Sequence, residues 1–351
     1  MKNKFWRRIV FVLALLGLLA GAAALFRLRG SAFRWDLFAT TLAGIDWLWL
    51  AGSLILVYCT YLGRAFRWRV MLRPLRPHPN FLNLLIATII GFTAIVLFGR
   101  PGELVRPYLI ATKERVPFSS QMAAWLLERI YDLLVVLLLF GFALAMFDKT
   151  APINGEMGPA LTFVFHLGGW VVAIACLACL TVLVLSSLYL PVFSKRISEA
   201  LEFLPHAWHN RAHEFIGSFV TGMQSTRSLA SVLTIVVYTL IEWLIIVAST
   251  YFLLRSVPAT SGLRLLDSLV IVGFIAFGSI VQLPGVGGGT QIATTVVLTE
   301  LYGLPLEVST GIAVLLWIVT FVSIVPAGLA LAAHEGLHWS KLRHIETKEI
   351  L

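Results

Sequence analysis

Residues 81–103 read FLNLLIATIIGFTAIVLFGRPGE, an almost purely apolar stretch that runs into a Gly-Arg-Pro-Gly sequence at 99–102. A membrane-spanning helix needs about 20 apolar residues, and this stretch is close to that length. Behind the break, residues 103–111 form an apolar stretch that is too short to cross again. Irregular backbone at membrane depth is tolerated only where protein or a water-filled cavity surrounds it. We therefore predict a re-entrant hairpin, made of one long arm, a Pro-Gly turn and one half-helix.

A second stretch repeats this order. Residues 267–289 read DSLVIVGFIAFGSIVQLPGVGGG, and the short apolar stretch 290–301 follows them. In both places a proline, Pro117 or Pro305, then leads into a long apolar segment. Interrupted segments at corresponding positions of two halves indicate the binding site of a transporter. Because three full spans separate the breaks, we expect hairpins that open from opposite sides, as an inverted repeat whose turns meet near the membrane midplane.

The rest of the chain is also apolar from end to end. Hydrophobic residues make up 59% of it and charged residues 13%, about half the charged fraction of a soluble protein. These features predict an all-α polytopic membrane protein with about eight hydrophobic segments. Beside the two broken ones, the segments are 9–26, 47–63, 119–147, 161–190, 229–254 and 307–333. The first is longer than the 7–15 apolar residues of a secretory signal, so it is expected to remain as a span.

We expect one transmembrane domain over residues 1–351, with a membrane-embedded core at 9–333. The apolar spacing within 191–228 predicts helices on the cytoplasmic membrane surface, and 334–351 is a predicted cytoplasmic tail. Lys and Arg mark cytoplasmic loops, and residues 1–8 and 64–80 are rich in them. We therefore expect a multi-pass protein of a plasma membrane of bacterial type, with both termini in the cytoplasm. Arg27, Arg29 and Arg34 would lie in the first outside loop, which argues mildly against this orientation.

The net charge of +9 is explained by the anionic lipid of the cytoplasmic leaflet. Nucleic acid is not an expected partner, because no basic stripe is interleaved with exposed aromatic residues. The expected partner is a membrane lipid, either an anionic phospholipid or an isoprenoid or glycolipid phosphate. A homo-oligomer or a partner from envelope biosynthesis is a further possibility.

Charged residues next to the first break are the strongest site candidates. Arg100, Glu103 and Arg106 are costly in apolar surroundings, so they should pair or face water. The planar fork of arginine suits a lipid phosphate, and half-helix N-termini attract anions. An ordinary loop outside the membrane is the alternative.

Carboxylates within two later spans complete the charged candidates. Glu128, Arg129 and Asp132 lie on one helical segment at spacings that allow pairing. They form either a structural ion-pair group with Arg100 or Arg106, or a group with a role in substrate passage or proton coupling. Glu242 is a lone carboxylate in its span and needs a partner or a proton. The sequence does not name that partner.

The second break is the other candidate region. Glycine permits positive φ and close backbone approach, which suits a re-entrant turn, but the stretch lacks the Lys and the spacing of a nucleotide-binding loop. The candidate residues here are Pro284, Gly285, Gly287, Gly288, Gly289, Thr290 and Gln291.

Other motifs carry less weight. Cys176 and Cys179 lie in an apolar stretch without charge to stabilise a thiolate. The histidines at 206, 209 and 213 have helical spacing but no protease motif. We expect no metal, no cofactor and no enzyme, since no nucleophile–base–acid group is visible.

The sequences GRPGELVR at 99–106, LERIYD at 127–132 and LPGVGGG at 283–289 together resemble the lysylphosphatidylglycerol synthase transmembrane region, a flippase-like membrane family. The resemblance covers residues 9–333. It implies the lipid-translocating part without the aminoacyl-transferase domain, since only 334–351 follow the last span. In the family a Glu usually follows the second break, whereas Thr290 and Gln291 stand there in this chain and the nearest acid is Glu300.

The main hypothesis is therefore a lipid flippase, in which Arg100 and Arg106 hold an anionic or phosphate head group. An integral-membrane transferase or phosphatase that uses Glu128 or Asp132 as a base is the alternative of a different class. A non-catalytic partner of an envelope glycolipid assembly complex is the third.

Overall fold

The computed structural model describes residues 33–146, 159–186, 229–279 and 281–336. Four of the described helices are long and apolar enough to cross a membrane, at Trp47–Leu72, Phe81–Phe98, Leu229–Ser256 and Leu306–His334. The chain is thus a multi-pass, helical membrane protein. The predicted segment 9–26, the surface helices at 191–228 and residues 337–351 of the tail lie outside the described residues, as do the three histidines.

The first part of the bundle comprises α2 (Trp35–Ala43), α3 (Trp47–Leu72), α4 (Phe81–Phe98), the 3-10 turn η1 (Arg100–Leu104), α5 (Val105–Glu114), α6 (Phe118–Ala145) and α7 (Pro159–Ser186). The second part comprises α10 (Leu229–Ser256), η4 (Pro258–Thr260), α11 (Leu265–Gly278), α12 (Gly289–Val296), the π-helix η5 (Val297–Leu301), α13 (Leu306–Trp317), the π-helix η6 (Ile318–Val322) and α14 (Val325–His334).

The helix ends follow from local chemistry. Asp46 caps α3 by accepting the backbone N–H of Leu48 at 2.9 Å, and Asn80 caps α4 by accepting that of Leu82 at the same distance. Such caps satisfy N–H groups that have no partner within the helix. Helix α4 ends at Phe98 and is capped by Gly99, whose φ of 70° is costly for a residue with a Cβ atom.

One predicted boundary is wrong. The apolar segment 47–63 was expected to end before a cytoplasmic loop at 64–80, but α3 continues to Leu72. Arg64 and Arg67 therefore lie on this helix instead of in a loop. Their apolar neighbours Ala65 and Trp68 are fully buried, and that burial explains why the helix continues past the first arginine.

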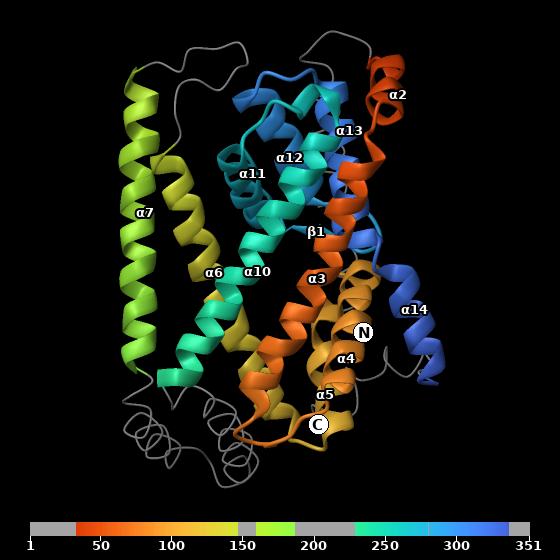
Figure 1. Cartoon of the computed structure of the whole chain (residues 1–351), viewed down its shortest axis with the longest axis vertical. Coiled ribbons are helices and arrows are strands. Elements are labelled where there is room, and N and C mark those ends of the chain that lie inside the picture. Colours follow the sequence, from red (N-terminus) through yellow and green to blue (C-terminus); the bar gives the residue numbers. More distant parts are fainter. Residues whose placement is uncertain (1–32, 147–158, 187–228, 280, 337–351) are drawn as a thin grey trace, which may run out of the picture.

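Both broken segments fold back on themselves (Figure 1). Along the first, Ala94 on α4 faces Gly102, and Gly91 faces Arg106 on α5, so the two arms are antiparallel. Along the second, Gly278 on α11 faces Gly289 and Ala293 at the start of α12. In Figure 1 the first hairpin lies in the lower half of the bundle and the second in the upper half.

The turns of the two hairpins touch. The backbone N–H of Gly285 donates to the carbonyl of Val96 at 2.8 Å. The guanidinium of Arg100 donates to the carbonyl of Ser279 at 3.3 Å. Two segments that are far apart in sequence thus meet at one place in the bundle.

The predicted all-α fold is confirmed for the described residues, and the glycine-rich turn adds two strands of two residues each. Strand β1 (Gln282–Leu283) pairs antiparallel with β2 (Gly287–Gly288), with Leu283 opposite Gly287. Gly285, Gly287 and Gly288 all have positive φ, which the tight reversal between the strands requires.

Helices α3 and α10 form the central pair that holds the two halves together (Figure 1). Ser53 and Ser249 bond reciprocally, since each hydroxyl donates to the backbone carbonyl of the other, at 2.8 and 3.1 Å. Small residues and hydroxyl bonds of this kind bring membrane helices into close contact. This pairing places the charged residues of α3 next to those of α10.

Candidate functional site

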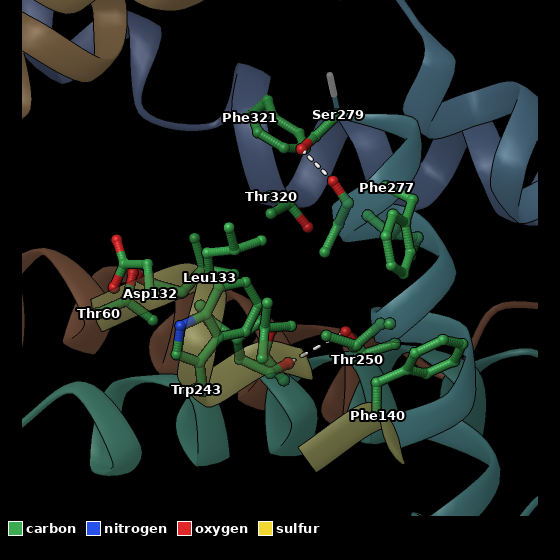
Figure 2. A pocket seen from close by; sticks show the side chains of 18 of the residues that line it. Thr60, Asp132, Leu133, Phe140, Trp243, Thr250, Phe277, Ser279, Thr320 and Phe321 are labelled. Carbon is green, nitrogen blue, oxygen red and sulfur yellow. Dashed lines mark hydrogen bonds between the residues drawn. The ribbon is translucent and has the colours of Figure 1, made fainter. Parts of the chain in front are cut away.

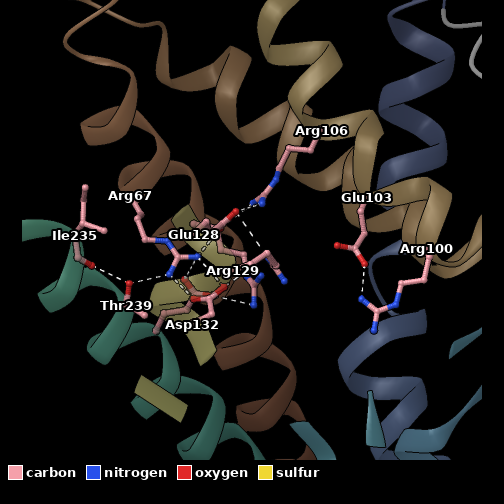
Figure 3. Close-up of polar contacts among 11 residues, drawn as sticks. Arg67, Arg100, Glu103, Arg106, Glu128, Arg129, Asp132, Ile235 and Thr239 are labelled. Atoms are coloured by element: carbon pink, nitrogen blue, oxygen red, sulfur yellow. Dashed lines mark hydrogen bonds and ion pairs between the residues drawn. The ribbon is translucent and has the colours of Figure 1, made fainter. Parts of the chain in front are cut away.

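A buried ion-pair network lies where α3, α5, α6 and α10 meet (Figure 3). Its centre is Arg67 on α3, whose side chain is fully buried. The guanidinium donates to Asp132 Oδ1 at 2.6 Å and to the hydroxyl of Thr239 on α10 at 2.9 Å, and it also binds Glu128. A buried charge is tolerated only when it is paired and hydrogen-bonded, and Arg67 meets both conditions.

Arg106 on α5 is the second arginine of the network. Both of its terminal nitrogens bind the carboxylate of Glu128, and its guanidinium lies over the Trp68 ring, 4.2 Å from the centroid. Gly91 makes room for it, because a Cβ atom there would lie 2.5 Å from the Cβ of Arg106. The sequence left Arg100 and Arg106 as alternative partners of Glu128. In the structure Arg106 pairs with Glu128, so its guanidinium already has a carboxylate partner.

Glu242 on α10 has the partner that the sequence could not name. Its carboxylate lies 2.8 Å from Arg64 and 3.4 Å from Arg67, both on α3. The guanidinium of Arg64 also lies over the Phe92 ring at 4.3 Å. The close packing of α3 and α10 therefore neutralises this carboxylate.

Arg129 on α6 is the fourth arginine and the least buried. It lies 3.6 Å from Glu128 and 3.5 Å from Asp132, and its side chain is 37% exposed. The network thus contains four guanidinium groups, those of Arg64, Arg67, Arg106 and Arg129, and three carboxylates, those of Glu128, Asp132 and Glu242. One positive charge remains without a matching carboxylate among these seven residues.

A cavity of about 350 Å³ adjoins the network (Figure 2). Most of its wall is apolar, with Leu133, Phe140 and Phe277 among the lining residues, whereas Arg64, Arg129 and Asp132 form a charged end. Of these lining residues, Leu133 is 54% exposed and Phe277 47% exposed. The cavity therefore combines a charged end with an apolar wall that includes accessible side chains.

A smaller cavity of about 120 Å³ lies between the two turns. The first hairpin contributes Arg100 and Glu103, and the second contributes Ser279, Gly287 and Thr290. The two cavities share part of their walls, formed by Tyr61, Phe92, Arg129, Ser279 and Phe321. The polar groups of the two turns thus lie directly beside the larger, apolar cavity.

Arg100 and Glu103 are separate from the buried network (Figure 3). They pair with each other at 2.8 Å, and the side chain of Arg100 is about half exposed. The candidates around the first break therefore fall into two groups, the Arg100–Glu103 pair at the small cavity and the buried Arg106.

The candidates of the second break have different surroundings. Gly287 and Thr290 line the small cavity, while Pro284 and Gly285 are exposed at the tip of the turn. The carboxamide of Gln291 holds the turn together, since it accepts the N–H of Gly288 at 2.6 Å and donates to the carbonyl of Val286 at 2.8 Å. Gly288 is the N-cap of α12 and Gly289 is its first residue, and neither of them lines either cavity.

Sequence reasoning missed Arg64, Arg67 and Thr239. The two arginines were counted as loop charges. Their helical neighbours Ala65 and Trp68 are apolar, and a lone carboxylate, Glu242, lies in another span. This combination could have indicated that α3 continues and that its arginines pair with Glu242. Within the described ranges, no group of three or more metal-ligating side chains is present.

One comparison with known proteins gave a match. The family model described as the lysylphosphatidylglycerol synthase transmembrane region matches residues 9–328. No curated protein and no solved structure matches the chain. The matched region contains both hairpins, the network and the cavities, and it confirms the resemblance carried by the motifs at 99–106, 127–132 and 283–289. The chain therefore belongs to the lysylphosphatidylglycerol synthase transmembrane-region family.

Proposed function

We propose that this protein is a flippase, which moves a lipid with an anionic or phosphate-bearing head group between the two leaflets of a membrane. The observation that carries the proposal is the pair of adjoining cavities at the meeting point of the two hairpin turns. A lipid has an apolar chain and a polar head, and the two cavities offer surroundings for both.

The arrangement of the hairpins supports the proposal. We infer that both are re-entrant, entering the membrane from opposite sides as an inverted repeat, so that their turns lie near the midplane. Transporters that are built from inverted repeats hold their substrates at this depth, between interrupted helices. Alternate opening on the two sides would then give a lipid access from either leaflet.

Access from the bilayer is supported by the apolar wall of the larger cavity. Leu133 on α6 and Phe277 on α11 line the cavity, and each is about half exposed. An acyl chain that enters between these helices stays in apolar surroundings, so its transfer from the bilayer costs little free energy.

Transport in proteoliposomes tests the proposal. The purified protein is reconstituted with a phosphatidylglycerol that carries a fluorophore on its acyl chain, and the fraction accessible to a membrane-impermeant quencher is followed with time. We expect that fraction to rise well above one half, while protein-free vesicles stay near one half. Wild-type vesicles that behave like protein-free ones would overturn the proposal.

A matched pair of variants links transport to the site. Arg100 and Arg264 both form an i,i+3 ion pair with a carboxylate, and their exposure is similar, but only Arg100 lines a cavity. We expect Arg100→Gln to slow transport and Arg264→Gln to leave its rate unchanged. Thin-layer analysis of the recovered lipid separates transport from catalysis, because a transporter returns the lipid chemically unchanged.

A further inference from the structure

Arg129 occupies a special position between the two cavities. Five residues line both of them, and Arg129 is the charged member of that set; the other four are Tyr61, Phe92, Ser279 and Phe321. The guanidinium of Arg129 therefore lies where the two cavities adjoin, within reach of a head group in either one. Its side chain is also the most exposed of the four arginines, at 37% against 13% for Arg64, 5% for Arg106 and 0% for Arg67.

The contacts of Arg129 are the longest in the network. Its distances of 3.5 and 3.6 Å to Asp132 and Glu128 exceed the 2.6 Å between Arg67 and Asp132. None of the hydrogen bonds that Glu128 and Asp132 accept in the described structure comes from Arg129. Its Nε atom is buried and has no hydrogen-bond partner. Arg129 is thus held by charge attraction, without directed hydrogen bonds.

If the Arg129 side chain moved away, Glu128 and Asp132 would each still have an arginine partner. Glu128 would keep Arg67 and Arg106, and Asp132 would keep Arg67. Breaking a buried ion pair is costly because it leaves an uncompensated charge, and here that cost is avoided. Arg64 lacks this freedom, since its release would leave Glu242 with Arg67 at 3.4 Å.

We propose that Arg129 is the exchangeable cation of the network, which leaves Glu128 and Asp132 to bind the phosphate of the transported lipid. This rests on the proposed function and names the residue and the ligand chemistry of its site. The ligand is a lipid with a phosphodiester of one negative charge, which balances the single surplus positive charge of the seven-residue network. The guanidinium fork binds two phosphate oxygens at once, and the acyl chains occupy the larger, apolar cavity.

Lipid binding to the purified protein tests the inference directly. Native mass spectrometry in detergent compares phosphatidylglycerol with diacylglycerol of the same acyl chains, which lacks the phosphate. We expect the wild type to bind phosphatidylglycerol about tenfold more tightly or better, as a charge-assisted hydrogen-bonded pair allows. Arg129→Gln should remove this preference and leave diacylglycerol binding unchanged, and Arg264→Gln should retain the preference.

Several outcomes would overturn the inference. A wild type without preference for phosphatidylglycerol has no phosphate site of this kind, and an Arg129→Gln variant that keeps the preference places the site elsewhere. If Arg129→Gln does not fold, Arg129→Lys replaces it in the test. Lysine keeps the charge but lacks the planar guanidinium fork, so the preference for phosphatidylglycerol should fall several-fold. A preference equal to that of the wild type would exclude binding of the phosphate by the guanidinium fork. The transport assay is independent of this binding test. Binding that depends on Arg129, without any transport, would refute only the proposed function.

Discussion

The carboxylate of Glu242 on α10 lies 2.8 Å from the guanidinium of Arg64 on α3. The two residues are far apart in sequence, and the pairing of their helices brings them together. Ser53 and Ser249 bond the same two helices. Because Glu242 is buried, its carboxylate needs a positive partner, and the guanidinium of Arg64 on α3 provides it.

A double-mutant cycle tests this ion pair. Arg64→Gln reduces the surplus charge of the network from one to zero, whereas Glu242→Gln raises it to two. We therefore expect Glu242→Gln to be the more destabilising change, and the double variant to cost less than the sum of the two. The coupling energy should fall within about 0.5–3 kcal/mol, measured by thermal unfolding in detergent. Additive effects of the two changes would contradict the pairing.

Part of this arrangement could be predicted from the sequence. The apolar segments and their Pro-Gly interruptions predicted the helices from α4 to α7 and from α10 to α14 to within a few residues, because hydrophobicity and helix-breaking residues are local properties. The order of the breaks also led to the expectation of turns that meet, which agrees with the Gly285–Val96 hydrogen bond.

The network could be predicted only in part, because its pairs are not local. Charge spacing along α6 identified Glu128, Arg129 and Asp132 as a group, and Arg106 was one of two named partners. Arg67 was missed because a hydropathy pattern ends a span at its first charge, whereas helix α3 continues past Arg64 and Arg67, which pair with buried carboxylates. Such pairing depends on which helices pack together.

Gly91 is predicted to be essential for the position of Arg106. A methyl group at residue 91 would lie 2.5 Å from the Cβ of Arg106 and 3.1 Å from its Cα, so Gly91→Ala must push α5 away from α4. Overpacking of this kind costs about 1–3 kcal/mol. Thermal unfolding in detergent measures the effect.

Gly63→Ala is the matched control for that substitution. Residue 63 lies within α3, and a Cβ atom there would have no neighbour within 4 Å. Alanine is a better helix former than glycine, so this change should leave the unfolding temperature unchanged or raise it. Equal effects at residues 63 and 91 would show that close approach of α5 does not decide the result.

The contact between the two turns can be tested at Gly285. Its φ of 72° disfavours any residue with a Cβ atom, and the strain costs about 1–2 kcal/mol. Gly285→Ala keeps the N–H that binds Val96, whereas Gly285→Pro removes it and also fixes φ near −65°. We expect the unfolding temperature to fall with alanine and to fall further with proline.

Gly336→Ala controls for backbone strain alone. Gly336 also has a positive φ, of 63°, and a Cβ atom there would meet nothing within 4 Å. It follows the C-cap Glu335 of α14 and belongs to neither turn. We expect a loss of stability similar to that of Gly285→Ala, but no effect on lipid transport. A fall in unfolding temperature for Gly336→Ala as large as that for Gly285→Pro would mean that strain, and not contact between the turns, explains the Gly285 variants.

Filling the larger cavity should slow transport without disturbing the ion pairs. Thr320 on η6 lines this cavity but belongs to no ion pair, so Thr320→Trp places a large aromatic ring where the acyl chain is proposed to lie. We expect the transport rate in proteoliposomes to fall at least about tenfold, which corresponds to about 1.4 kcal/mol in the barrier. Thr234→Trp is the control, since Thr234 on α10 is also partly exposed but does not line either cavity. Transport at the wild-type rate in a folded Thr320→Trp protein would exclude this cavity as the lipid path.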